Sequence, residues 1–159
     1  MSVVIREMRD AEAGRIAGMV RGLAAHIGTG ITPQLTGEGL VAARDLVDAV
    51  VAEEKGRLLG ACLGLMTYST WRGVRGLYVV DLYVEPEARG RKLGEALLRA
   101  LARRAAARGA QFIKLEVDGS NRGAERFYAR LGFDKKAEDR LHILEQDRLQ
   151  HFIAMGDGT

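Results

Sequence analysis

The stretch from Tyr78 to Arg108 constrains the fold of this chain more than any other part of the sequence. It begins with the apolar run YVVDLYV, continues through the turn EPEA and the basic glycine loop RGRKLG, and ends in a long segment rich in alanine, leucine and arginine. This order predicts a strand over 78–84, buried on both faces, then a loop and a helix over 92–108 that Gly109 closes. A glycine loop at a helix start exposes backbone N–H groups at the positive end of the helix dipole. The stretch is therefore expected to hold a phosphate group.

The positive charge of the chain is concentrated in the same stretch. Between Arg89 and Arg108 seven basic residues stand against one acid, which gives +6; the whole chain carries +3, so the remainder carries −3. Such a local concentration favours an anionic ligand over a general affinity for nucleic acid, although residues 99–108 also fit a solvated, arginine-rich helix face. No aromatic residues are interleaved with these arginines, which argues against a nucleic-acid-binding domain.

The composition is that of one globular domain over residues 1–159, large enough to bury a core. No apolar run is long enough to span a membrane, and no secretory signal is visible at the N-terminus. The single cysteine, Cys62, excludes an internal disulfide and fits a reducing compartment, so a cytoplasmic protein is expected. Its neighbours are apolar, which indicates a core residue.

Hydrophobic periodicity and turn residues predict an α/β fold in the order β-α-α-β-β-β-α-β-α-β-β, with a mixed, mostly antiparallel sheet flanked by helices. A short glycine link between 48–53 and 57–68 predicts a hairpin. The second helix is expected to be capped by Thr36 and to bury Leu40, Val41 and Val47. The other expected elements are strand 3–5, helix 11–26 capped by Asp10, strand 112–117, helix 121–132 capped by Asn121, strand 133–140 and a final strand 150–155.

Two familiar nucleotide loops do not fit the glycine loop. A P-loop requires GxxxxGK[ST], but Gly90 is followed four residues later by Gly94-Glu95. A dinucleotide fingerprint GxGxxG is also absent. ATP hydrolysis and NAD binding are therefore not supported.

The loop resembles that of the GCN5-related N-acetyltransferases (GNAT), which reads Arg/Gln-x-x-Gly-x-Gly/Ala between a strand and a helix. A second stretch typical of that family, Asn-x-x-Ala-x-x-Phe-Tyr-x-x-x-Gly-Phe, is matched by residues 121–133. The two motifs occur in the family's order, and the strand order agrees over nearly the whole chain. The resemblance implies a GNAT fold and acetyl-CoA as co-substrate, with no metal.

By this resemblance, an amine attacks the thioester directly in a ternary complex. The backbone of the strand segment Leu82, Tyr83 and Val84 would polarise the thioester carbonyl and pair with the pantetheine arm. The residues expected to hold the coenzyme A pyrophosphate are Arg89, Gly90, Arg91, Lys92, Leu93 and Gly94. Asn121 would hydrogen-bond the cofactor, and Tyr128 would protonate the leaving thiolate.

Two positions depart from the family pattern. Lys92 stands where the loop has a glycine and is expected to adopt helical φ/ψ; its ammonium would lie beside the diphosphate or point to solvent. Val80 stands where the polyamine-like branch has a glutamate. Asp81 is then the nearest candidate base, with a structural hydrogen bond to a loop as the alternative. His26, placed in the loop after the first helix, is a further candidate base or a surface residue.

The resulting expectation is an N-acetyltransferase acting on a primary amine of a small molecule or peptide. The alternative is a non-catalytic module with a degenerate acetyltransferase fold that binds coenzyme A or a partner protein. The loops Gly28–Gly37 and Trp71–Gly76 are candidates for shaping the acceptor site. Members of the resembling family often pair through their C-terminal strands, so a homodimer through Gln150–Met155 is expected.

Overall fold

The computed structural model describes residues 2–28 and 30–155, which fall into two compact units. The first unit runs up to Asn121 and holds a sheet with helices on both faces, and the second begins at Arg122 and holds two further helices. Each unit has its own secondary structure, and the single domain over residues 1–159 stays a prediction.

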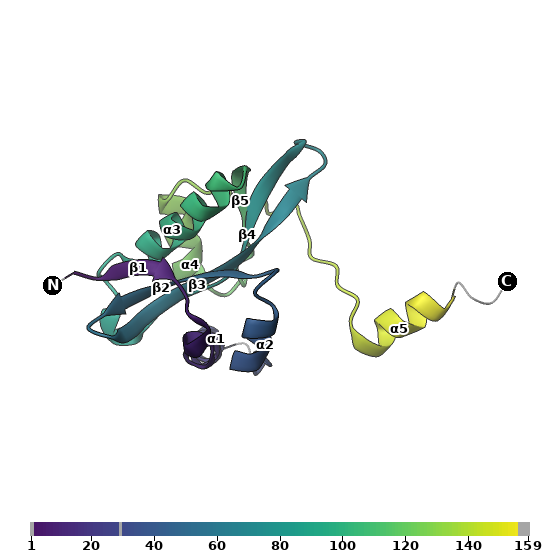
Figure 1. Ribbon diagram of the computed structural model, residues 1–159. Coiled ribbons are helices and arrows are strands. Elements are labelled where there is room, and N and C mark those ends of the chain that lie inside the picture. Colours follow the sequence, from purple (N-terminus) through teal and green to yellow (C-terminus); the bar gives the residue numbers. More distant parts are fainter. Residues whose placement is uncertain (1, 29, 156–159) are drawn as a thin grey trace. The chain divides into compact units, whose positions relative to one another are not determined.

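A five-stranded mixed sheet forms the centre of the first unit, with its strands side by side in chain order (Figure 1). The strands are β1 (Val4–Glu7), β2 (Asp48–Glu54), β3 (Arg57–Ser69), β4 (Val74–Val84) and β5 (Ala110–Lys114). Pairing is antiparallel from β1 to β4, whereas β5 runs parallel to β4. Lys55 and Gly56 link β2 to β3 with φ of 53° and 78°, the positive values that a tight hairpin turn requires. The predicted fold class and hairpin are confirmed.

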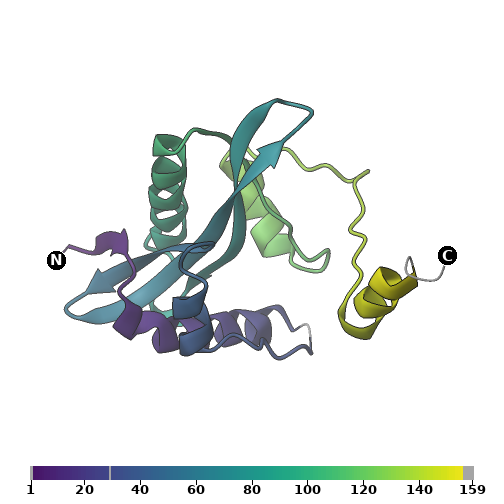
Figure 2. The ribbon, with the colours of Figure 1, turned by 45° about the vertical axis from the view of Figure 1, so that its right-hand side comes forward.

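Helices cover both faces of this sheet. α1 (Ala13–Ile27) and α2 (Gly37–Ala42) lie on one face, and α3 (Leu93–Ala107) lies on the other (Figures 1 and 2). Because β4 and β5 are parallel, the chain must cross over between them, and α3 makes that crossover. Leu97 and Leu101 are fully buried, so the predicted leucine stripe of this helix is confirmed.

On the other face, α1 and α2 bury a single apolar cluster against β2 and β3. Its large members are Met8, Ile16, Met19, Leu40, Val51, Leu58 and Leu63. The hydroxyl of Thr36 accepts a hydrogen bond from Gly39 N at 3.0 Å, which confirms the predicted cap of α2. Val41, in contrast, is 37% exposed, and Val47 lies beyond the end of the helix, packed against the cluster. The prediction that Val41 is buried was wrong, because this residue lies about 100° around the helix from its buried neighbour Leu40.

The first helix begins later than its capping pattern predicts. Asp10 does not cap α1 but starts a short 3-10 turn, η1 (Asp10–Glu12). The carboxylate of Glu12 accepts a hydrogen bond from Arg9 N at 2.8 Å and forms an ion pair with Arg6 at 2.6 Å. These contacts close the turn before the helix starts at Ala13.

The second unit contains α4 (Arg122–Arg130) and α5 (Gln146–Ala154). The predicted strand 133–140 is absent, since no residue between Phe133 and Glu145 lies in a helix or strand. The predicted final strand Gln150–Met155 was also wrong, because this segment belongs to α5. Leu149, Phe152 and Ile153 follow the i, i+3, i+4 spacing of a helix, which outweighs the strand preference of the residues around Phe152 and Ile153.

Candidate active site

The edge of β4 next to β5 is free along its second half. β5 ends at Lys114, three residues earlier than predicted, and its pairing with β4 stops at Tyr78. On the other edge, β4 stays paired with β3 as far as Val84. Among the described residues, no strand therefore covers residues 79–84 on that edge, and those of their backbone N–H and C=O groups that point away from β3 are available to a ligand.

A β-bulge interrupts β4 where the free edge begins. Leu63 pairs with Asp81 and the next residue of β3, Gly64, pairs with Val79, so Val80 is an extra residue on β4. A bulge bends its strand and re-aims the side chains around it. Val80 is accordingly 48% exposed, and the prediction that both faces of this strand are buried was wrong there.

Asp81 follows the bulge and lies half-buried. Burial raises the pKa of its carboxyl group, because the charged form loses hydration. No hydrogen bond or ion pair joins its carboxylate to another of the described residues, so the loop contact of the structural alternative is not present among them. The Cys62 thiol is buried beside it; burial, and next the charge of Asp81, raise the pKa of Cys62 to about 12. Cys62 is the core residue that its apolar neighbours predict.

The side chain of Tyr83 packs against α1 and Arg89, whereas its backbone is part of β4. A Cβ built on Gly22 of α1 would lie 2.9 Å from the Tyr83 hydroxyl, so this ring packs closely against α1. Arg89 lies over the ring, 5.8 Å from its centre, and Arg89 Nε donates a hydrogen bond to the Val84 carbonyl oxygen at 3.0 Å. These contacts join the loop to the end of β4. The Tyr83 carbonyl oxygen lies toward Gly60 of β3, so neither the ring nor this carbonyl faces the free edge where the predicted contact with pantetheine would form.

The loop between β4 and α3 turns on two residues with positive φ. It passes through the short turn η2 (Pro86–Ala88) to Gly90, with φ of 80°, and Lys92, with φ of 59° and ψ of 24°. The expectation of helical φ/ψ at Lys92 was wrong: the residue is in the left-handed region, which glycine occupies at less cost. Lys92 is also the N-cap of α3 and makes no side-chain capping bond. The first N–H groups of α3 therefore have no cap from this side chain and can bind an anion.

The basic side chains of the loop have different partners. Arg91 forms an ion pair with Glu54, at the end of β2, through N–O contacts of 2.8 and 3.2 Å. This pair lowers the pKa of Glu54 and fixes the loop against the β2–β3 hairpin. The Lys92 ammonium has no ion pair with any residue in the described part of the chain. Lys92 thus differs from Arg91, whose charge is already paired with that of Glu54.

The sequence could not reveal the Glu54 contact, because no local pattern links residues 37 positions apart. It does carry a signal for the close packing behind the site. Isolated glycines within a strand indicate close approach of another backbone. Gly60 of β3 is such a position, since a Cβ there would lie 2.6 Å from the Tyr83 carbonyl oxygen.

The remaining candidates lie outside this part of β4 and its loop. Asn121 ends the first unit, and its N–H donates to the Asp118 carbonyl oxygen at 2.8 Å. Tyr128 belongs to the second unit, where its ring makes edge contacts with Phe127 and Phe133 at centroid distances of 5.1 and 5.3 Å. His26 is exposed and lies in the last turn of α1, not in the loop that follows it.

Comparison with known proteins identifies the family of this chain. A family model described as the acetyltransferase (GNAT) family matches residues 31–133. The chain belongs to the GNAT acetyltransferase family. It is 33% identical over 143 residues to thialysine N-epsilon-acetyltransferase of Sus scrofa, a match that covers 82% of this chain and 84% of the relative.

Two further acetyltransferases are similar to parts or to most of this chain. An L-methionine sulfoximine/L-methionine sulfone acetyltransferase of Pseudomonas paraeruginosa is 36% identical over 78 residues, 47% of this chain and 45% of the relative. The solved structure of a ribosomal-protein-alanine N-acetyltransferase from Brucella melitensis superposes with a TM-score of 0.75 over 90% of this chain and 99% of that one. Its sequence identity is 20%, so this likeness concerns the fold alone. Acetyl-CoA is the co-substrate of the GNAT family.

The left-handed Lys92 leads to a stability prediction. Replacement of Lys92 by glycine is expected to leave the protein about 1 kcal/mol more stable than replacement by alanine, since only glycine adopts positive φ without a steric cost. The two variants remove the same charge and differ in backbone freedom. Urea unfolding of both measures the difference, and equal free energies of unfolding would show that the left-handed conformation is not retained.

Proposed function

We propose that this protein is an acetyl-CoA-dependent N-acetyltransferase that acetylates a primary amine of a small molecule or peptide by direct attack in a ternary complex. The observation that carries the proposal is the free edge of β4 leading into the uncapped start of α3, within a GNAT chain. The extended free edge suits an arm with amide groups, and the helix start suits a diphosphate. The donors present therefore fit coenzyme A.

The cofactor contacts are assigned along this path. In the segment Leu82, Tyr83 and Val84, the backbone groups that point to the free edge are assigned to the pantetheine arm and to the thioester carbonyl. The pyrophosphate is assigned to the loop and helix start, where the residues are Arg89, Gly90, Arg91, Lys92, Leu93 and Gly94. Asn121 is assigned a hydrogen bond to the cofactor. When bound, acetyl-CoA supplies the activated acetyl group, so no protein nucleophile is needed.

Two side chains are assigned to proton transfer. Asp81 accepts the proton that the incoming amine must lose, directly or through a water. Its half-buried position and its freedom from other hydrogen-bond partners among the described residues support this role. Tyr128 donates a proton to the leaving thiolate, since a phenol stays protonated at neutral pH.

Replacement of Asp81 by asparagine tests the base. It is expected to lower turnover about tenfold. This loss is smaller than the loss expected when a base that takes the proton directly is removed, because part of the amine loses its proton to water without help. Burial raises the pKa of Asp81, so the wild-type rate should fall as the pH drops through a value above the usual ~3.9. The variant should lose this low-pH limb, and a variant that keeps both rate and limb would remove Asp81 from the mechanism.

The acceptor is proposed to be a lysine-like amine. The support is the relative in Sus scrofa, named for an amine of this kind, which matches most of both chains. A panel of lysine, thialysine, a diamine and methionine sulfone, assayed by release of the coenzyme A thiol, ranks the candidates. Cys62 is buried and its thiol stays protonated, so it should not contribute to the signal. Absence of turnover with every amine would contradict the proposal for this substrate class.

The second candidate function is a non-catalytic module that binds coenzyme A, motivated by Lys92 and Val80. Thermal unfolding with saturating acetyl-CoA separates the outcomes. Stabilisation with thiol release supports the enzyme, and stabilisation without release supports the binding module. No stabilisation would overturn both.

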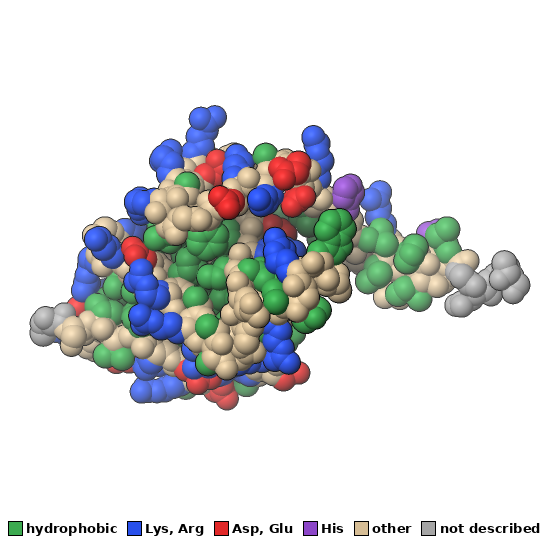
Figure 3. Space-filling view, turned by 90° about the horizontal axis from the view of Figure 1, so that it is seen from above, with side chains coloured by type: hydrophobic (Ala, Val, Ile, Leu, Met, Phe, Trp, Pro, Cys, Tyr) green, Lys and Arg blue, Asp and Glu red, His purple; other side chains and the backbone are tan. Residues whose placement is uncertain are grey.

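We also propose a homodimer in the cytoplasm. The strand that suggested the dimer is part of α5, but this helix exposes apolar side chains: Leu149, Phe152 and Ile153 are 40%, 64% and 57% exposed. In Figure 3, hydrophobic side chains, coloured green, gather on the surface of this segment. Replacement of Phe152 by serine should shift the mass measured by light scattering toward the monomer. None of the helices in residues 2–28 and 30–155 is long and apolar enough to cross a membrane.

A further inference from the structure

One face of the sheet places an aromatic ring and further charges next to Asp81. On β3, Leu63 pairs with Asp81 and Leu65 pairs with Tyr78, and residues two positions apart on a strand share a face. Tyr78 and Asp81 therefore lie on the same face as Leu63, which belongs to the apolar cluster under α1. Because a strand rises about 3.3 Å per residue, the two positions are about 7 Å apart along the sheet.

β5 adds two charges of opposite sign at Tyr78. Lys114 pairs with Tyr78, and its ammonium nitrogen lies 5.7 Å from the centre of the Tyr78 ring. Glu116 follows two residues later. Burial raises the pKa of the Tyr78 hydroxyl, and a hydrogen bond to the Glu116 carboxylate, and then the charge of that carboxylate, raise it further. The hydrogen bond holds the Glu116 carboxylate at this end of the ring.

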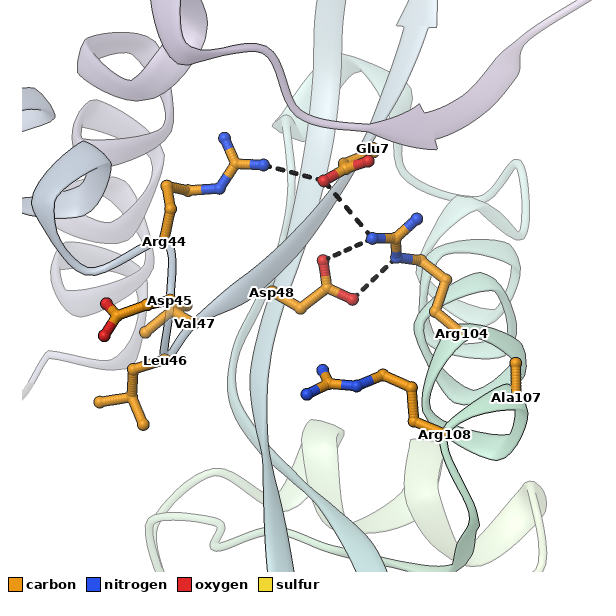
Figure 4. Close-up of a pocket in the computed structure, with 9 residues that line it drawn as sticks. All are labelled: Glu7, Arg44, Asp45, Leu46, Val47, Asp48, Arg104, Ala107 and Arg108. Atoms are coloured by element: carbon orange, nitrogen blue, oxygen red, sulfur yellow. Dashed lines mark hydrogen bonds and ion pairs between the residues drawn. The ribbon is translucent and has the colours of Figure 1, made fainter.

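Neither of these charges is paired within the described part of the chain. Lys114 and Glu116 are exposed, and neither forms an ion pair with another residue in the ranges 2–28 and 30–155. The cavity at the far end of α3, drawn in Figure 4, shows the contrast: there Arg104 binds Asp48 through two hydrogen bonds, at 2.7 and 3.0 Å. Those two charges neutralise each other, whereas Lys114 and Glu116 are available to a ligand.

The charges at this face match those of a free diamino acid. Such a molecule, of which lysine is an example, carries two ammonium groups and one carboxylate at neutral pH. Asp81, Glu116 and Lys114 present the opposite set, two carboxylates and one ammonium group. The next cation along this face, Arg72, lies over the ring of Phe112, two residues before Lys114, and is therefore farther from Asp81.

The length of the lysine side chain also fits. Five bonds of about 1.5 Å separate its α-carbon from its amine nitrogen, and they span about 6 Å when the chain is extended. An α-carbon at Tyr78 therefore brings the side-chain amine to Asp81, the proposed base, about 7 Å away. The α-ammonium group then meets Glu116 and the α-carboxylate meets Lys114, through charge-assisted hydrogen bonds.

We propose that Glu116 and Lys114 form the specificity subsite for the acceptor and select a free diamino acid of the length of lysine by binding its α-ammonium and α-carboxylate groups. This inference rests on the proposed transferase function. It narrows the acceptor from any primary amine of a small molecule or peptide to a free amino acid, because peptide bonds would remove both α charges.

The test is calorimetric titration of the full chain with three ligands in excess coenzyme A, which carries no acetyl group and so permits no turnover. L-Lysine has both α groups, 1,5-diaminopentane lacks the α-carboxylate and 6-aminohexanoate lacks the α-ammonium. Replacement of Glu116 by glutamine should raise the dissociation constant for lysine about tenfold and leave that for 6-aminohexanoate within twofold. Replacement of Lys114 by glutamine should weaken lysine equally and leave 1,5-diaminopentane within twofold.

Matched controls remove the same charges elsewhere in the first unit. Glu38 of α2 and Lys55 of the β2–β3 turn are exposed and form no ion pair with a described residue, so their glutamine variants should change lysine binding less than twofold. Equal losses in the Glu38 and Glu116 variants would reduce the effect to net charge and overturn the proposal. It is also overturned if wild type does not bind lysine, or if the Glu116 variant weakens lysine and 6-aminohexanoate alike.

Thiol release with acetyl-CoA separates this inference from the proposed function. Lysine binding that depends on Glu116 and Lys114, without thiol release, contradicts the transferase function and upholds the subsite. Release with other amines, from a wild type that does not bind lysine, supports the transferase function and overturns the subsite. If the Glu116 variant lowers kcat for lysine and 6-aminohexanoate alike at unchanged KM, Glu116 acts in proton transfer and the proposed binding role is wrong.

Discussion

Replacement of Tyr128 by phenylalanine is expected to lower turnover about 100-fold, at the lower end of the range for loss of a general acid. The substitution removes one hydroxyl and keeps the ring that contacts Phe127 and Phe133, so the second unit should fold as before. Without the phenol, the thiolate must leave unprotonated or take its proton from water. Acetyl-CoA affinity should change little, because the proton moves only when the thioester breaks.

The measurement is the rate of thiol release at saturating acetyl-CoA, with affinity from calorimetry. Replacement of Tyr68 by phenylalanine is the control: this tyrosine is 60% exposed near the end of β3, and the change removes the same hydroxyl. An unchanged rate in the Tyr128 variant would remove this residue from the mechanism. A parallel loss of rate in the control would point to a general effect of the lost hydroxyl groups.

Replacement of Gly60 by alanine is expected to lower the free energy of unfolding by about 2–3 kcal/mol. The new Cβ would lie 2.6 Å from the Tyr83 carbonyl oxygen and 3.0 Å from Leu97 Cδ1, so β3 must move away from β4 or from α3. Backbone cannot swing aside as a flexible side chain can, which makes this clash costly. Urea unfolding measures the loss.

The same substitution should also weaken acetyl-CoA binding, because Tyr83 belongs to the strand segment proposed to hold the pantetheine arm. The affinity is measured at a temperature where the variant is folded. Replacement of Gly14 by alanine is the control: a Cβ at this position in α1 meets nothing within 4 Å, and alanine should stabilise the helix by about 0.5–1 kcal/mol. If the Gly60 variant is as stable as wild type, the strands are not packed this closely.

Local patterns in the sequence were sufficient to predict the helices and turns whose structure depends on neighbouring residues. The leucines at 93, 97 and 101 are one helical turn apart, and all three are buried. Lys55 and Gly56 form the tight turn that their position between two apolar runs predicts. The two family motifs, about thirty residues apart, identified the GNAT fold, which the family match and the solved structures confirm.

The same patterns failed where two local preferences compete. Gln150–Met155 holds residues that favour strands, but the spacing of its apolar side chains is helical and α5 forms. Lys92 follows glycine's backbone path although a lysine prefers negative φ, because the loop must turn sharply from β4 into α3. In both cases the outcome depends on how the chain packs, and single-residue preferences of about 1 kcal/mol cannot decide it.

The sequence by itself determined the order of the elements up to α4 and the glycine loop, because each depends on residues within one or two turns of each other. It also determined the family, through two motifs that each span only a short stretch of the chain. Only the tertiary structure decided which groups are free to act. It placed the bulge at Val80 and ended β5 at Lys114, which together leave the edge of β4 open. It also paired Arg91 with Glu54 and brought Tyr78 to Glu116. These contacts join residues that are tens of positions apart, so their partners are set by how the strands align and not by any local pattern.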